Sequence, residues 1–510
     1  MKTALTLALI LFLLWVPAAD ARRDPVAAAP FAAEADRWIP DALATLEVVP
    51  GISVAVVVDD QVVLARAYGI ADLNTGAAAE ADTQFYIASA TKPFTALLAA
   101  ILDARGTIDL ESAFSEHAPG ITFAPELHAG EVKLVDLLSH TSGIDCGPIG
   151  FRVAYTGQHD PETLWNLLNH CTPSEDAPLG TYKYTNVGYN ILTMFLDREL
   201  ATTWQELLQQ EIFGPLGLER TTAYASLGER NGWTVAGPHF GLHPDGVQRL
   251  SLVKQDNTMQ SAGGMMTTAL DAARWLEFQL NLGRVGGTQI VDADVVRRTH
   301  EKLTEATGRD PLFEQNGYGY GWSHGTYGGH RVLSHGGGFP GLRSVLSFMP
   351  DDGIAVAAMV NEPSVGGELL GAVVGYAYDW WLGSETDPGE LVKQIVGMRD
   401  AVTPRVAADF EKRAAREWQL ARRRVDYAGT YVSDLYGTME IVEEGGDLRV
   451  EFGNLHCTGD PYTKEESMRV ELIPGTGEVI VFEPAKGSVT GLHYADEWFE
   501  RVSAPTSGTD

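Results

Sequence analysis

Hydrophobic and polar positions alternate in distinct ways along the chain, and these patterns predict its elements. Residues 51–58 and 62–68 are two runs rich in β-branched side chains on either side of a polar turn. Two such runs around a polar turn predict a β-hairpin. Longer apolar-rich segments predict helices at 31–46, 93–103, 189–200 and 369–382.

A second strand-rich region begins near Tyr318. Residues 344–349 and 354–360 flank the turn Pro350-Asp351-Asp352-Gly353, which is a strong hairpin signal. Strands at both ends of a segment, with helices between them, predict one α+β domain that is closed by its two ends. We expect this domain to occupy residues 22–390.

The pattern changes after this domain. Residues 391–424 are predicted to form a locally basic connecting helix, with binding to a membrane surface as the less favoured alternative. From residue 425 to 504 short alternating runs are separated by Gly and Asp, which predicts a small all-β barrel or sandwich. Residues 505–510 are expected to be a disordered tail.

The first 21 residues have the pattern of a signal peptide. Lys2 precedes an apolar run at 4–16, and Ala19-Asp20-Ala21 resembles a cleavage site. We expect cleavage after Ala21 and export to the periplasm or the medium; an uncleaved anchor is the alternative. No later segment reaches about 18 uninterrupted apolar residues, so no stable membrane insertion is expected after cleavage.

Composition narrows the class of protein. The chain has 510 residues, of which 45% are hydrophobic and 21% charged, as in globular proteins of two or more domains. Its net charge of −31 disfavours binding to nucleic acid. The expected partner is a small molecule or a short peptide, and the oligomeric state stays open.

Three cysteines allow one disulfide in an exported protein. Cys146 and Cys171 lie in the same loop-rich region and are the favoured pair, with free thiols as the alternative; the third is Cys457. Their spacing matches no zinc motif, so neither a metal nor another cofactor is expected.

The segment from Ser89 to Lys92 is the first candidate for chemistry. Residues three apart on a helix project from the same face, so this hydroxyl and this amine can meet. Pro93 is tolerated only in the first turn of a helix, so the helix should begin near Ser89. A helix start favours a developing anion, and a lysine among apolar neighbours can act as a base.

Two further motifs follow in the chain. Tyr184 and Asn186 stand in a loop and offer a phenol for proton relay and a carboxamide for a substrate amide. His335 precedes three glycines, which would let a strand edge approach a ligand closely. His140, in Leu-Leu-Ser-His-Thr-Ser-Gly, is expected to fix its loop by hydrogen bonds rather than to act as a base.

Together, Ser89-x-x-Lys92, Tyr184-x-Asn186 and His335-x-Gly337 resemble the serine β-lactamase and penicillin-binding superfamily. They are most similar to its class C-type branch, which includes D-aminopeptidases, D,D-peptidases and family VIII esterases. The resemblance covers about residues 30–385. It implies an antiparallel sheet flanked by helices plus a helical subdomain, and the segment after 425 resembles a C-terminal lipocalin-like barrel.

The resemblance also implies roles. Ser89 would attack a carbonyl carbon and become acylated, with Lys92 and Tyr184 sharing the proton transfers. The backbone N–H groups of Ser89 and Gly338 would form the oxyanion hole. Asn186, His335 and Gly337 would contact the substrate.

Position 335 departs from the family pattern, because β-lactamases carry a lysine there. An imidazole is mostly neutral at pH 7 and offers less fixed positive charge. The expected substrate is therefore a peptide, a D-amino-acid amide or a carboxylic ester, with β-lactamase or penicillin-binding D,D-carboxypeptidase activity as the alternative. A different class of function, an inactive sensor or binding module, is disfavoured because Ser89, Lys92 and Tyr184 are all present.

Overall fold

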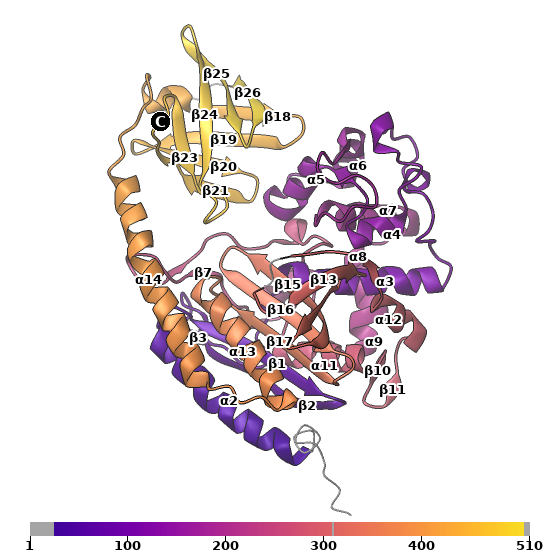
Figure 1. Cartoon of the computed structure of the whole chain (residues 1–510). Coiled ribbons are helices and arrows are strands. Elements are labelled where there is room, and N and C mark those ends of the chain that lie inside the picture. The colour runs from indigo at the N-terminus through magenta and orange to yellow at the C-terminus, as the bar shows by residue number, and fades with distance from the viewer. Residues whose placement is uncertain (1–24, 309–310, 504–510) are drawn as a thin grey trace, which may run out of the picture.

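The computed structural model describes residues 25–308 and 311–503, and its centre is a nine-stranded antiparallel sheet (Figure 1). The predicted α+β class is confirmed. Strand β1 from the beginning of the domain pairs with β17 from its end, so the two ends close the sheet together. In spatial order the strands are β12 (Lys302–Thr304), β13 (Glu314–Gly319), β14 (Ser323–Tyr327), β15 (His330–Phe339), β16 (Leu342–Met349), β17 (Ile354–Val360), β1 (Gly51–Val58), β2 (Gln61–Asp72) and β3 (Ala77–Ala78).

Both predicted hairpins are present, as β1–β2 and as β16–β17. Strand β1 is fully buried, and its alternate residues enter two different cores. Val54 and Val56 pack with the helices α2 (Pro25–Leu46) and α13 (Val365–Leu382), whereas Ala55 and Val57 pack toward α3 (Lys92–Ala104) and α11 (Ala269–Leu280). The sheet is therefore covered on both faces, which explains its nearly continuous apolar central strands.

A helical lobe stands beside the sheet and faces the amino end of α3 (Figure 1). It contains the predicted helix after Asn186, and its short helices pack through one shared apolar core with α3. The helices are α4 (Leu134–Ser139), α5 (Gly147–Phe151), α6 (Pro161–Leu167), α7 (Val187–Leu200) and α8 (Trp204–Leu208).

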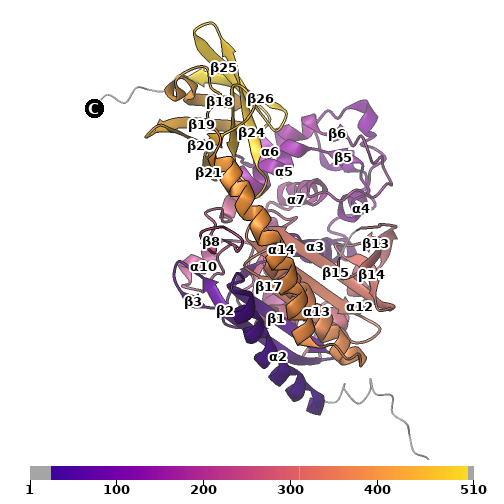
Figure 2. The same cartoon turned by 60° about the vertical axis from the view of Figure 1, so that its left-hand side comes forward.

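The connecting helix is shorter than predicted. Helix α14 (Pro388–Ala414) ends ten residues before the expected end at 424, and Figure 2 shows it running along the sheet side of the molecule up to the barrel. Beyond it, Trp418 and Leu420 pack on the apolar core of the barrel. That contact favours an irregular path over further helical turns, so the three arginines at 422–424 lie outside the helix.

The carboxyl-terminal region is an antiparallel barrel of nine strands that is nearly closed (Figure 1). Four of its strands coincide with the predicted alternating runs, whereas the three middle strands and the two edge strands were not predicted. In spatial order the strands are β21 (Leu455–Thr458), β20 (Asp447–Phe452), β19 (Gly437–Glu444), β18 (Gly429–Ser433), β26 (Glu497–Ser503), β25 (Ser488–Tyr494), β24 (Glu478–Ala485), β23 (Ser467–Val470) and β22 (Asp460–Pro461).

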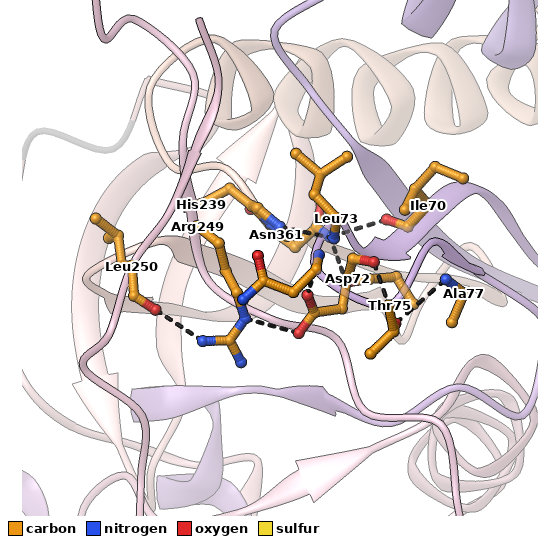
Figure 3. Close-up of polar contacts among 11 residues, drawn as sticks. Ile70, Asp72, Leu73, Thr75, Ala77, His239, Arg249, Leu250 and Asn361 are labelled. Carbon is orange, nitrogen blue, oxygen red and sulfur yellow. Dashed lines mark hydrogen bonds and ion pairs between the residues drawn. The ribbon is translucent and has the colours of Figure 1, made fainter. Parts of the chain in front are cut away.

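A polar network ties the end of the sheet to the turn between β15 and β16 (Figure 3). Arg249 Nε lies 2.8 Å from an Asp72 carboxylate oxygen, and Asn361 Nδ2 donates to the carbonyl of Ile70. The His239 ring accepts a hydrogen bond from the backbone N–H of Leu73. The backbone N–H of His239 donates to the carbonyl oxygen of Gly341 in the turn. The turn is therefore bonded to the backbone of His239, whose ring contacts Leu73 and Asn361.

Two predictions concern segments outside the described residues, namely the signal peptide at 1–21 and the tail at 505–510. Within 25–308 and 311–503, every helix is too short or too polar to cross a bilayer.

Candidate active site

Ser89 lies on a short 3-10 turn, Ala88–Thr91, that leads directly into α3. The helix start predicted from Pro93 is thus confirmed, with Pro93 in its first turn. Ala88, just before the serine, has a φ of 46°, a left-handed conformation that a residue with a Cβ seldom adopts. Strain of this kind, about 1–3 kcal/mol, persists where the surrounding structure enforces it and is common at functional sites.

Lys92 brings three separate segments together. Its Nζ lies 3.2 Å from Ser89 Oγ, 2.8 Å from Asn186 Oδ1 and 2.8 Å from the carbonyl oxygen of Ala262. The side chain is fully buried and has no carboxylate partner among the described residues. Burial therefore lowers the pKa of Lys92 well below its ordinary value, because the charged form is poorly solvated.

The geometry around Nζ suits an uncharged amine. A neutral amine has two N–H bonds and one lone pair. Asn186 Oδ1 and the carbonyl oxygen of Ala262, which are nearer to Nζ than Ser89 Oγ is, accept hydrogen bonds from these two N–H groups. The lone pair is left to accept a hydrogen bond from the hydroxyl of Ser89. The arrangement can therefore take the proton of Ser89.

Tyr184 lies on the other side of this pair. Lys92 Nζ is 4.7 Å from the centre of its ring, and its hydroxyl interacts with Ser89. The side chain is 43% exposed, yet desolvation still raises the pKa of Tyr184 above its ordinary value. Tyr184 thus keeps its proton near neutral pH and can donate it.

His335 is close to the site, and both nitrogens of its ring contact other groups of the protein. One ring nitrogen contacts the carbonyl of Gly336 at 2.7 Å and the other contacts the hydroxyl of Tyr318 at 3.1 Å. Burial lowers the pKa of His335 to about 3, and a charged Lys92 would lower it further. Both nitrogens are thus occupied within the protein and the ring is neutral, and the substrate contact of His335 stays a prediction.

The three glycines after His335 differ in orientation and in packing. A Cβ at Gly337 would lie 1.9 Å from the carbonyl oxygen of Ile87, so only glycine lets β15 approach the Ser89 turn this closely. Gly336 and Gly338 point to the other face and are exposed. Strand β14 pairs with β15 only up to Ser334. From His335 onward β15 is paired with β16 on one side, and its other edge has no strand partner in the described chain.

The matches with known proteins agree with this arrangement. A family model described as β-lactamase matches residues 39–377, which is well over half of the chain. The chain belongs to the β-lactamase family. The family predicted from the three motifs is thereby confirmed, and with it the class of β-lactamase-fold serine hydrolases.

Several proteins are similar to this β-lactamase-family chain. Penicillin-binding protein 4 of Amycolatopsis lactamdurans is 29% identical over 327 residues, 63% of this chain and 83% of that protein. D-aminopeptidase of Brucella anthropi is 25% identical over 511 residues, 87% of this chain and 92% of that protein. The structure of the octameric penicillin-binding protein homologue from Pyrococcus abyssi matches with a TM-score of 0.58 and 19% identity, over 92% of this chain and 99% of that one.

The motifs did not reveal every residue of the site in this β-lactamase-family chain. The carbonyl of Ala262 and the hydroxyl of Tyr318 contact the site but lie outside the three motifs. His140 had been predicted to fix its loop. It accepts a hydrogen bond from the N–H of Thr185, and its ring lies 4.5 Å from that of Tyr184, so it does hold the Tyr184 loop.

The favoured cysteine pair is close together but unbonded. Cys146 and Cys171 are buried, free and hydrogen-bonded to each other. The predicted disulfide is therefore present only as a contact between two thiols. Within the described residues, no group of His, Cys, Asp and Glu side chains has an arrangement that could hold a metal ion.

Proposed function

We propose that this protein hydrolyses short peptides or D-amino-acid amides through an acyl-enzyme on Ser89. The observation that carries the proposal is the position of Lys92 Nζ, 3.2 Å from Ser89 Oγ with two other acceptors beside it. A buried amine held in this way is a base for a nucleophile that is otherwise weak at neutral pH.

In the proposed acylation, Ser89 Oγ attacks the carbonyl carbon while its proton passes to Lys92. The oxyanion receives hydrogen bonds from the backbone N–H groups of Ser89 and Gly338. Such donors contribute about 3–4 kcal/mol to the transition state in a well-studied protease. Tyr184 keeps its proton because its pKa is raised, so it serves as the donor that delivers a proton to the leaving nitrogen.

In the proposed deacylation, water attacks the ester carbonyl of the acyl-enzyme. Its proton passes to the Lys92–Tyr184 pair, Ser89 regains its own proton, and the acid is released. Asn186 Oδ1 accepts from Lys92, so its other amide atom can contact the acyl group of the substrate.

The substrate class is inferred from two facts. The match with a D-aminopeptidase covers 87% of this chain. The neutral, enclosed His335 offers no fixed charge for a β-lactam carboxylate, which makes β-lactam hydrolysis the less favoured reaction. Esters are a second candidate, since they are attacked by the same serine. The proposed reaction takes place after export through the signal peptide at 1–21.

The test is covalent labelling of the purified protein with a fluorophosphonate, followed by mass spectrometry. The expected adduct is on Ser89, and S89A is the matched control. An unlabelled Ser89 in folded protein would contradict the mechanism. D-amino-acid anilides, nitrophenyl esters and a chromogenic cephalosporin, assayed side by side, then rank the substrate classes.

A further inference from the structure

Residues 261–263 lie against the turn that carries Ser89. A Cβ at Gly263 would lie 3.6 Å from the backbone nitrogen of Ser89. The middle carbonyl of this segment, that of Ala262, is the one that accepts a hydrogen bond from Lys92 Nζ at 2.8 Å. The position of the segment therefore determines where one of the two acceptors of the lysine stands.

The carbonyls on either side of Ala262 have hydrogen-bond donors of their own. Thr95 Oγ1 donates to the carbonyl of Ser261 at 2.8 Å. The hydroxyl of Tyr86 donates to the carbonyl of Gly263. Both donors are buried, and both come from the short segment that also carries the nucleophile and its lysine. Three successive carbonyls are thus held by three side chains of one segment.

Thr95 is placed for this contact by its position on α3. It follows Lys92 by three residues, so the two side chains project from the same face of the helix. Its side chain is fully buried, which keeps water from replacing its hydrogen bond. One helix face therefore holds the carbonyl of Ser261 and also brings the amine to the next carbonyl along the chain.

Ser261 is bound as well to the helix that follows Asn186. Its Oγ donates to the carbonyl of Tyr189 at 3.0 Å and accepts from Thr193 Oγ1 at 2.7 Å, and both partners lie on α7. Asn186 stands directly before the first residue of α7. The segment with one acceptor of the lysine is thus fixed to the helix that places the other acceptor.

We propose that Thr95 is a positioning residue that directs the lone pair of Lys92 to Ser89. It does so by holding the carbonyl of Ser261 and, with it, the neighbouring peptide that presents its carbonyl to the amine. This inference rests on the proposed function and deepens it. A neutral amine whose two N–H groups are held by fixed acceptors has only its lone pair left for a third contact. Without the bond from Thr95 one acceptor can move away, and the freed N–H then donates to Ser89 Oγ.

The titratable groups that face Lys92 keep their charge state near neutral pH. The ring centres of Tyr184 and Tyr189 lie 4.7 and 5.5 Å from Nζ, and desolvation raises the pKa of both phenols. Burial lowers the pKa of the imidazoles of His140 and His335, to about 3 for His335. A change in the pH dependence of acylation therefore reports on Lys92 itself.

The experiment measures the rate of fluorophosphonate labelling of Ser89 against pH in the native protein, T95V and T95S. Valine is similar in shape to threonine but has no hydroxyl, so T95V removes the hydrogen bond and keeps the side chain apolar and branched. We expect the plateau rate of T95V to fall about tenfold, because the lone pair is no longer directed. The midpoint of the acidic limb should fall by up to about one pH unit, since the charged amine loses more than the neutral one when a carbonyl moves away. T95S keeps the donor and should restore both values.

The matched control is T91V. Thr91 is equally buried in the Ser89 turn, but its Oγ1 has no hydrogen-bond partner among the described residues. T91V should therefore label with the native rate and the native midpoint. If T95V does not fold, Y86F tests the same arrangement from the other side, because it removes the donor to Gly263; a slower plateau and a lower midpoint are expected again.

Three results would overturn the inference. They are a native rate in the variant that lacks the hydroxyl, a slower rate with an unmoved midpoint, and an equal effect in T91V. A native protein in which Ser89 is not labelled at any pH would instead count against the proposed function, so the two failures are distinguishable.

Discussion

Two buried lysines, Lys92 and Lys254, share an environment but differ in what they face. Neither has a carboxylate partner among the described residues, and both donate to backbone carbonyls. Burial lowers the pKa of both, to about 7 for Lys254. Lys92 faces the hydroxyl of Ser89, whereas Lys254 Nζ lies over three aromatic rings.

The rings around Lys254 belong to Tyr86, Tyr155 and Phe339, with Phe339 nearest at 4.5 Å. Aromatic faces attract a cation but cannot give up a proton at neutral pH. The lysine therefore joins Tyr86, three residues before Ser89, to Phe339, which follows Gly338. It is connected to the barrel through the tilted rings of Tyr155 and Phe151, because Phe151 contacts Phe452 of β20. A lowered pKa makes a lysine a base only where a nucleophile stands beside it.

The largest effect is expected for K92M. This variant keeps the apolar stem but removes the amine, so acylation of Ser89 should fall about 10³–10⁴-fold, within the range of a lost general base. The rate of fluorophosphonate labelling measures it. K183M, a change at an exposed lysine of the Tyr184 loop, should label at the native rate; a K92M protein that labels equally fast would remove Lys92 from the chemistry.

Y184F tests the proton donor. The ring stays in place, so we expect turnover of an anilide to fall about 10–100-fold because its leaving nitrogen needs a proton. Hydrolysis of a nitrophenyl ester, whose leaving group needs none, should fall less. Y182F, at the neighbouring tyrosine, is the control. An equal loss with both substrates would show that Tyr184 acts in a step common to them.

N186D would place a carboxylate beside Lys92 and so give the amine a partner for an ion pair. A carboxylate 2.8 Å from Nζ favours the charged amine, so the pKa of Lys92 should rise. We expect about tenfold lower kcat/KM at pH 7, with recovery as the pH is raised by one to two units. The measurement is a pH–rate profile. A loss that is constant across pH would mean that the variant disturbs geometry instead of protonation.

K254M should have the smallest effect on activity, about threefold or less, but a visible effect on stability. In the native state Lys254 loses its proton near pH 7, whereas the unfolded chain keeps it to about pH 10.4. Between these values the unfolded state binds more protons, so Lys254 makes stability rise with pH.

A comparison of K254M with the native protein isolates the contribution of Lys254 to the pH dependence of stability. The stability of K254M relative to the native protein should be highest near pH 6 and decline by about 1–3 kcal/mol toward pH 10. Urea unfolding at several pH values measures it. Parallel pH curves for the two proteins would show that Lys254 does not titrate in this range.

Local patterns in the sequence predicted much of this fold. The β-branched runs at 51–58 and 354–360 became central strands, because a strand covered on both faces must be apolar throughout. Pro93 marked the start of α3 because proline lacks an N–H and is best accommodated in the first turn, where that group has no partner. The helix at 391–424 was predicted too long, since the docking of Trp418 on the barrel is not visible in its own segment.

The sequence by itself determined the candidate residues of the site, because Ser89, Lys92, Tyr184 and Asn186 stand in recognisable motifs. Only the tertiary structure decided how each one is placed. Long-range contacts brought the hydroxyl of Tyr318 to the ring of His335 and placed Lys254 among three aromatic rings. Such contacts depend on segments far apart in the chain, so no local pattern records them.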